Sequence, residues 1–396
     1  MPLQDHMKLV SVDDHVIEHP EVWRDRLPKS FGDRLPRVVR TTGGESLAGG
    51  GELLPERDVW VYDGDIYPQI GLNAVAGKKW EDFGIDPYRF SEMRPGCYDP
   101  AERVKDMDTE GVWAQTTFPS LPGFGGRFFL NGSDRELALQ CVQAWNDFII
   151  DEWCAAAPER FIPLMILPVW DIERSVAEIG RMAGKGARGI SFIENPAAAG
   201  LPSWHTGHWD SVFAAAVETE LPLCMHFGSS GSMPSVSKDA PFTTAIVLSN
   251  TSSMATCVDL LFSPVPVFHR FPKLQVALSE GGIGWVPWLL ERTDHIWQRH
   301  RHYNDIDFDT RPSELFRRNI WTCFIDDRHG MGLRESIGID RITWESDYPH
   351  ADSNFPHSRK AAAEHFVDVP DDETHKIAEL NARRLFRFPD NTKGAA

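Results

Sequence analysis

Six acidic and histidine side chains stand at the ends of five short apolar runs in this sequence. Asp13 and His15 end the first run, in the segment SVDDHVIEH, and their spacing of two residues points both side chains to one face of an extended chain. The other four end four later runs, in the segments FIEN, CMHFGSS, LSEGG and WESDYPH: Glu194, His226, Glu280 and Asp347. Imidazole and carboxylate groups without a thiolate suit iron, manganese or zinc.

The four carboxylates in this set make a bound metal the physical expectation. Carboxylates that crowd together repel one another at neutral pH, and a cation removes that cost. A single ion needs only four of the six residues: Asp13, His15, His226 and Asp347. Glu194 and Glu280 are then available for a second ion or for proton transfer. The full set is also the ligand inventory of dinuclear iron–carboxylate proteins.

Each of these residues also has an ordinary structural interpretation. An isolated histidine at a strand end is usually a hydrogen-bonded structural group, and an aspartate there is often a helix N-cap. His350 follows Asp347 by three residues and fits a ligand of a second ion, a substrate-positioning group or a structural side chain equally well. The convergence of six such groups at strand ends favours a functional site over six coincidences.

Eight apolar or β-branched runs provide the elements that must position these groups. Their ranges are 8–13, 112–118, 161–167, 189–193, 223–226, 274–279, 319–324 and 341–344. Continuous apolar runs are typical of parallel strands buried on both faces. Helical segments lie between most of them, and the longest, 134–157, is expected to begin after an N-cap at Ser133.

Strand–helix alternation repeated eight times predicts an α/β fold, a (β/α)8 TIM-like barrel with its active site at the carboxyl ends of the strands. A doubly wound open sheet is disfavoured, because VDDHVIEHP is not a glycine-rich phosphate loop. We expect one domain over residues 1–396, with a long insertion between the first two strands at residues 20–100. This insertion is interpreted as a lid on the barrel mouth or as a dimer contact.

Composition excludes several classes of function. The chain has 396 residues and a formal charge of −18, and this acidic balance without a basic cluster argues against a nucleic-acid partner. No run of 18 apolar residues and no signal segment is present, so we expect no membrane partner and a cytoplasmic location. The six cysteines form no CxxC pair, which excludes the commonest structural zinc site.

Five segments carry a resemblance to a known family: VDDHVIEHPEVW, ENPAAAGLPSWHTGHWD, MHFGSS, LSEGGIGWVPWLLER and ESDYPHADSNFPH. With them, nearly the whole chain resembles the amidohydrolase-2 branch of the metal-dependent amidohydrolase superfamily, which implies a (β/α)8 barrel. By this resemblance Asp13 and His15 match the metal pair of strand one. His226 and Asp347 match the ligands of strands five and eight.

Departures from the family pattern bear on the reaction. The pair Asp13-x-His15 replaces the usual HxH and is closer to the Glu-x-His of decarboxylase-like members, whose acid–base histidine on strand six is here Glu280. Glu194 stands where binuclear hydrolases carry a carboxylated lysine. The sub-branch of the family that this chain resembles is also similar to a group that includes dinuclear non-haem iron oxygenases. We therefore expect a monooxygenase with two iron ions that hydroxylates a bulky apolar substrate, such as an acyl-CoA-linked one.

Two other functions stay open. In a mononuclear hydrolase or a non-oxidative decarboxylase of a small carboxylate, one Zn²⁺ or Mn²⁺ would suffice, and Glu280 and His350 would be the catalytic candidates. In a non-catalytic binding barrel the carboxylate cluster would be incidental. Both enzymatic interpretations take a small molecule as substrate, and a homodimer is a further expectation.

Overall fold

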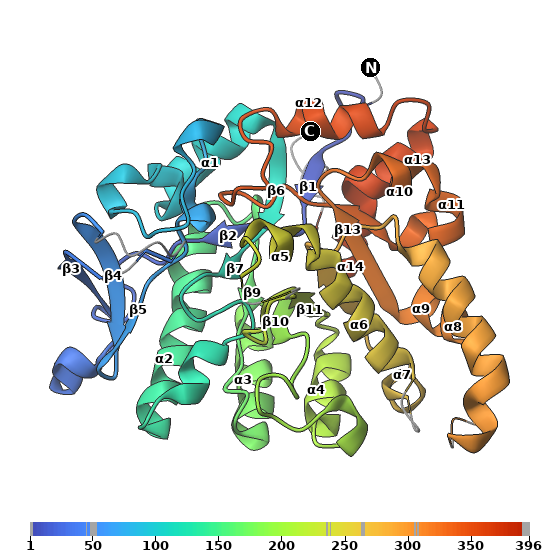
Figure 1. Ribbon diagram of the computed structural model, residues 1–396, viewed down its shortest axis with the longest axis horizontal. Helices are drawn as coiled ribbons and strands as arrows, with labels where there is room; N and C mark the ends of the chain where they lie inside the picture. The colour runs from blue at the N-terminus through green and yellow to red at the C-terminus, as the bar shows by residue number, and fades with distance from the viewer. Residues whose placement is uncertain are drawn as a thin grey trace.

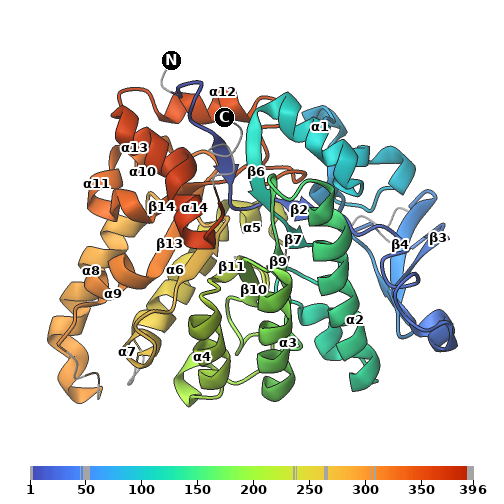
Figure 2. The same ribbon diagram turned by 180° about the vertical axis from the view of Figure 1, so that it is seen from behind.

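The eight predicted runs form one parallel sheet that curls into a barrel (Figures 1 and 2). The computed structural model describes residues 3–44, 46–47, 54–234, 237, 239–262, 266–304, 306 and 309–389. The strand order is β8-β6-β1-β14-β13-β12-β11-β10-β9. The bounds of these strands are β1 Leu9–Ser11, β6 Val112–Thr116, β8 Phe161–Ile162, β9 Leu164–Met165, β10 Gly189–Ile193, β11 Leu223–His226, β12 Val276–Ser279, β13 Ile320–Phe324 and β14 Ile342–Trp344.

The two ends of this sheet, β8 and β9, belong to a single run of the chain. Gln115 of β6 pairs with Phe161, and Ile190 of β10 pairs with Met165, so the run joins both neighbours. Pro163 lies between the two halves and has no N–H to donate to the ladder, which divides the run into two short strands. The strands therefore close a ring of eight, and the predicted (β/α)8 barrel is confirmed.

Helices surround the strands on the outside of the barrel (Figure 1). Their bounds are α1 Pro100–Glu110, α2 Arg135–Phe148, α3 Ile172–Lys185, α4 Asp210–Thr219, α5 Thr243–Val247, α6 Ser249–Leu261, α7 Val267–Arg270, α8 Val286–His300, α9 Pro312–Asn319, α10 Arg328–Gly332, α11 Arg334–Ile337, α12 Ser358–His365, α13 Asp371–His375 and α14 Asn381–Phe386. Among the described helices, none combines the length and the apolar character that crossing a membrane requires.

The expected N-cap of the helix after the second barrel strand is wrong by one residue. The carboxylate of Asp134, not the hydroxyl of Ser133, accepts the free backbone N–H groups of α2, from Glu136 at 3.0 Å and Leu137 at 3.1 Å. Ser133 instead donates both its N–H, at 2.8 Å, and its hydroxyl to Asp63 of the insertion. Ser133 therefore bonds to Asp63, a residue distant in sequence, and does not cap the helix as the local sequence predicts.

The long insertion between the first two barrel strands contains a small antiparallel sheet, with strands β3 Arg37–Thr41, β4 Arg57–Tyr62 and β5 Asp65–Tyr67. This sheet lies beside α2 at one edge of the barrel (left in Figure 1, right in Figure 2). Trp60 packs edge-on against Trp23, and Tyr62 against Phe129, which anchors the sheet to the barrel core.

A later part of the same insertion reaches the loop that follows β14. The 3₁₀-helix Gly71–Ala74 is followed by Val75 and Ala76, whose N–H groups both donate to the carbonyl of Pro349, at 3.1 and 3.2 Å. The short strand β2 His15–Val16, which precedes the insertion in sequence, pairs in parallel with β7 Phe118–Pro119, which follows it. The insertion is therefore bonded to the loop that carries Asp347 and His350.

Glycine at position 71 is required by close backbone packing. A Cβ there would lie 2.2 Å from the carbonyl oxygen of Asp86 and 2.5 Å from that of Gly84. We expect Gly71→Ala to lower the free energy of unfolding by about 1–3 kcal/mol, because backbone atoms cannot move aside cheaply. Gly180→Ala in α3 is the control, since a Cβ there meets nothing within 4 Å. It should raise stability by about 0.5–1 kcal/mol. Urea unfolding measures both, and equal midpoints for the two variants would contradict the prediction.

Candidate metal centre

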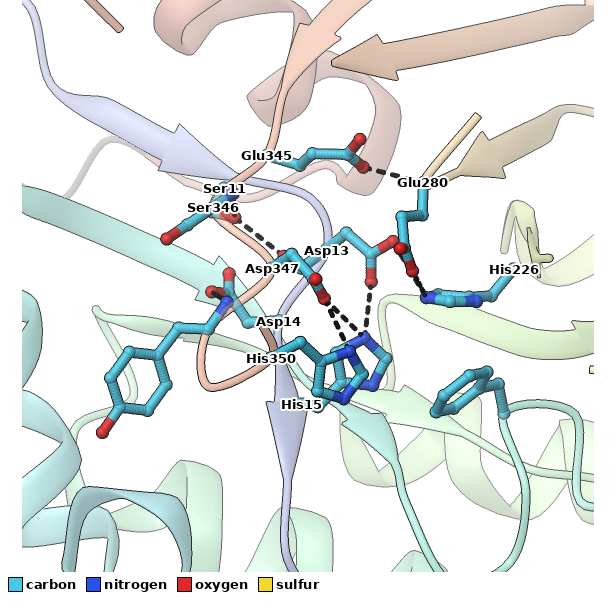
Figure 3. A network of polar contacts seen from close by, with 12 residues as sticks. Ser11, Asp13, Asp14, His15, His226, Glu280, Glu345, Ser346, Asp347 and His350 are labelled. Atoms are coloured by element: carbon cyan, nitrogen blue, oxygen red, sulfur yellow. Dashed lines mark hydrogen bonds and ion pairs between the residues drawn. The ribbon is translucent and has the colours of Figure 1, made fainter. Parts of the chain in front are cut away.

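Four of the predicted ligands come together at the carboxyl ends of the strands (Figure 3). His15 Nε2 lies 3.3 Å from Asp13 Oδ1 and 3.2 Å from Asp347 Oδ1. His226 Nε2 lies 3.4 Å from Asp13 Oδ2. All four side chains are buried. Asp13 lies between β1 and β2, His15 is the first residue of β2, His226 ends β11, and Asp347 follows β14.

The polar atoms that face one another here lack hydrogen bonds. Both carboxylate oxygens of Asp13, both ring nitrogens of His15 and Nε2 of His226 are buried without a hydrogen-bond partner. Nδ1 of His226 lies 2.6 Å from the carbonyl oxygen of Phe227, to which it donates, so the lone pair of Nε2 faces the centre. Buried polar groups are normally satisfied. Converging unsatisfied lone pairs therefore fit one divalent cation.

The electrostatics of the centre support the same interpretation. Burial raises the pKa of Asp13 well above its usual value, and the neighbouring Glu345 and Glu280 raise it further. Burial also raises the pKa of Asp347, with Glu280 and Asp13 adding to the effect. The pKa of His15 is lowered by burial. A cation is the group that would keep these carboxylates ionised and these imidazoles neutral.

Glu280 extends the centre toward solvent. Its Oε2 lies 3.0 Å from His226 Nε2, and it belongs with His226 and Asp347 to one possible ligand group. Glu280 and Asp347 both adopt left-handed backbone conformations, with φ of 52° and 57°. Such angles are strained for residues other than glycine, and they persist at functional sites where surrounding contacts hold them.

His350 stacks on His15, with ring centroids 3.7 Å apart and an angle of 19° between the planes. Its Nδ1 lies 2.9 Å from Asp347 Oδ1, whereas its buried Nε2 has no hydrogen-bond partner. Burial lowers the pKa of His350, which favours the neutral ring. A proton on Nδ1 donated to Asp347 would leave a lone pair on Nε2.

Glu194 is the predicted ligand that the structure does not bring into this group. Its Oε2 accepts the N–H of Ser230 at 2.7 Å and the hydroxyl of Ser229. Its Oε1 accepts the Ser230 hydroxyl at 2.9 Å and the Gly228 N–H at 3.1 Å. The carboxylate is thus satisfied by the loop after β11, and the possible metal-ligand groups among the described residues do not include it.

Two buried carboxylates beside the centre were missed by sequence reasoning. Glu345 follows β14 directly and accepts the N–H of Glu280 at 3.1 Å and the thiol of Cys323 at 2.6 Å. Burial raises the pKa of Glu345 to about 7. Asp14 accepts the N–H of Tyr348 at 3.0 Å, which joins the first and last strand loops. The sequence signal for both is their place beside a predicted ligand: Asp14 directly follows Asp13, and Glu345 stands two residues before Asp347.

Two cavities meet at this centre. One, of about 380 Å³, has Glu280, Asp347 and His350 in its wall together with mainly apolar side chains. The other, of about 580 Å³, is polar and has Glu345 in its wall. Glu280 and Asp352 line both. A small molecule in the first cavity would therefore contact the candidate metal centre directly.

Two curated relatives and one solved structure are similar to this chain. A gamma-resorcylate decarboxylase from Rhizobium sp. (strain MTP-10005) is 26% identical over 313 residues, which cover 72% of this chain and 86% of that protein. A 2-amino-3-carboxymuconate-6-semialdehyde decarboxylase from Dictyostelium discoideum is 25% identical over 275 residues, which cover 67% and 70%. The structure of 5-carboxyvanillate decarboxylase from Novosphingobium aromaticivorans DSM 12444, complexed with manganese and 4-hydroxy-3-methoxy-5-nitrobenzoic acid, superposes with a TM-score of 0.57 at 20% identity, covering 74% and 81%.

These relatives correct the expected reaction. The expectation of a dinuclear iron monooxygenase is wrong, because the similar curated proteins are decarboxylases. That expectation was based on the acidic ligand set and on a resemblance to dinuclear iron oxygenases. The first is weakened by Glu194, whose carboxylate is engaged by Ser229 and Ser230. The case for two iron ions and for an acyl-CoA-linked substrate depended on the same interpretation and has no support here.

The resemblance at the level of the family is confirmed. A family model described as amidohydrolase (Amidohydro_2) matches residues 47–388, which is most of the chain. The barrel and the ligand-bearing strand ends agree with it. This protein therefore belongs to the Amidohydro_2 family of the amidohydrolase superfamily.

Proposed function

We propose that this protein is a metal-dependent, non-oxidative decarboxylase of a small carboxylate substrate. The observation that carries the proposal is the group of unsatisfied buried atoms of Asp13, His15 and His226, beside a cavity lined by Glu280 and His350. The two curated relatives are decarboxylases, which favours decarboxylation over the hydrolase alternative. Hydrolysis by the same centre, with Glu280 as general base, remains the competing reaction to be tested.

One divalent ion would be held by four residues: Asp13, His15, His226 and Asp347. Manganese is the first candidate, because a decarboxylase structure with the same fold contains it, and zinc is the second. When bound, the ion supplies positive charge that holds the substrate's oxygen atoms and stabilises negative charge as the reaction proceeds. This charge matters because none of the described residues lining the first cavity is Lys or Arg.

Non-oxidative decarboxylation consumes one proton for each turnover. The bond between the substrate carbon and its carboxylate breaks, a C–H bond forms at that carbon, and CO₂ leaves. We assign Glu280 to deliver this proton, since its carboxyl group lines the cavity beside His226. Solvent then returns a proton to the Glu280 carboxylate. His350, whose Nδ1 is held by Asp347, would position the substrate through Nε2.

The proposal is tested by measuring CO₂ release from the manganese-loaded protein with a panel of aromatic carboxylates. The panel includes 2,6-dihydroxybenzoate, 5-carboxyvanillate and alkyl-substituted salicylates. We expect CO₂ and the decarboxylated product in equal amounts, at the same rate with and without oxygen. Hydrolysis of ester or amide substrates without CO₂ release from any acid would instead establish the hydrolase alternative.

A further inference from the structure

The lining of the first cavity, which has a volume of about 380 Å³, has two parts: residues of the candidate metal centre and a wall of apolar side chains. The loops after β12 and β14 contribute its acidic and imidazole groups: Glu280, Asp347, His350 and Asp352. The insertion, the loop after β7 and the segment after β11 contribute most of the apolar groups. The apolar side chains include Ile70, Leu72, Phe124, Phe227, Phe242 and Ile246. A ligand that fills this cavity must therefore place its polar group at the centre and its body against hydrocarbon.

Charge at this wall disfavours a ligand with a second anionic group. The described lining residues include three carboxylates and neither Lys nor Arg. Arg127 lines a separate cavity of about 160 Å³, which shares only Gly228 and Gly231 with the first. A second carboxylate on the ligand would lose its hydration without gaining a counter-charge, which is strongly unfavourable.

The insertion holds its part of the wall in place through backbone hydrogen bonds. Gly71 donates its N–H to the carbonyl of Ile85 at 2.8 Å, and Val75 and Ala76 donate to Pro349. Pro349 lies between Asp347 and His350 in sequence, so the segment bearing Ile70 and Leu72 is tied to the loop that carries both. Its side chains are half-buried, as expected for a pocket wall. This segment shapes the cavity as a fixed element rather than as a loose surface loop.

We propose that the cavity selects a monocarboxylate with a bulky apolar body and no second charged group, and that Ile70 and Leu72 are specificity-determining residues. The proposal rests on the proposed function in one respect only, the binding of a carboxylate at the centre. It also gives the insertion a role: the part around residues 70–76 closes the barrel mouth over the apolar end of the substrate.

Binding of two probe acids tests this selection independently of turnover. Calorimetry on the full-length, manganese-loaded protein measures the dissociation constants of 4-pentylbenzoate and benzene-1,4-dicarboxylate. We expect 4-pentylbenzoate to bind at least about 100-fold more tightly, because the apolar wall accepts the alkyl chain and penalises a charge. Equal affinities, or tighter binding of the dicarboxylate, would overturn the proposal.

Substitutions in the apolar wall of the cavity test which residues cause this binding preference. Leu72→Arg should weaken the binding of 4-pentylbenzoate by about 10-fold, because it places a charge in the apolar wall. It should strengthen the binding of benzene-1,4-dicarboxylate by about 10-fold, because the guanidinium supplies the missing counter-charge. Ile66→Arg is the matched control: Ile66 lies in the same insertion, is 64% exposed and does not line the cavity. It should leave both constants unchanged. If Leu72→Arg does not fold by circular dichroism, Leu72→Ala replaces it and should weaken 4-pentylbenzoate but not benzoate; unchanged binding would overturn the assignment of Leu72.

The outcomes separate this inference from the proposed function. Tight, selective binding of 4-pentylbenzoate with no CO₂ release from any acid would leave the pocket assignment intact and overturn the decarboxylase proposal. CO₂ release with a preference for dicarboxylates would support the decarboxylase proposal and overturn the pocket assignment.

Discussion

His226→Ala is expected to leave the protein folded but unable to retain its divalent ion. The Nδ1 of His226 is held by the carbonyl of Phe227, and its Nε2 faces Asp13 Oδ2 at 3.4 Å. Alanine removes the Nε2 lone pair, a metal-binding atom that is already oriented toward the candidate metal centre. Loss of an outer partner of a metal ligand already costs about 10–100-fold in affinity, so loss of the ligand itself should exceed about 100-fold. Turnover should fall with the metal content.

Metal content after dialysis, measured by plasma mass spectrometry, is the primary readout for this variant. The wild-type protein should retain about one ion per chain if the four ligands form a mononuclear site. His205→Ala serves as the control, because that imidazole pairs with Asp259 at 2.6 Å and its side chain is 34% exposed. Retention of metal by the His226 variant at the wild-type level would rule out the proposed centre.

Glu280→Gln is expected to separate chemistry from metal binding. The amide has nearly the same shape as the carboxyl group but cannot deliver a proton to carbon. Loss of a positioned acid typically costs about 10²–10⁴-fold in rate, so kcat should fall by that amount while KM changes little. The four proposed ligands, Asp13, His15, His226 and Asp347, are unchanged in this variant, so metal content should stay near the wild-type value.

The comparison with Glu194→Gln sharpens this experiment. Glu194 is satisfied by Ser229 and Ser230, so its replacement should leave both the metal content and the proton-delivery step intact. Loss of metal from Glu280→Gln would instead make Glu280 a ligand, a role compatible with its 3.0 Å approach to His226. In that case the proton donor would have to be sought elsewhere in the cavity wall.

Much of the architecture could be predicted from local patterns. Parallel barrel strands are buried on both faces and appear in the sequence as continuous apolar runs, so eight such runs predict the eight strands. Each barrel strand of the structure lies within its predicted range. The pair Asp13 and His15 could be predicted from spacing alone, since alternate residues of an extended chain face the same side. His226 and Asp347 could be predicted because strand ends of a barrel converge on one mouth.

Other features depended on contacts between distant segments. Asp134 rather than Ser133 caps α2, because Asp63 of the insertion takes the serine. The lid, the homodimer and the cytoplasmic location stay predictions. The reaction was misassigned because a list of ligand types describes neither their positions nor their protonation.

The sequence by itself determined the barrel, the order of its strands and which donor types stand at its mouth, since these depend on local apolar patterning and residue identity. Only the tertiary structure decided which donors meet. Glu194 turns to the loop after β11, while Glu345, which local reasoning passed over, holds the backbone of Glu280. The physical reason is that a carboxylate binds whichever donors fold closest to it, and those donors lie 34 to 65 residues away along the chain.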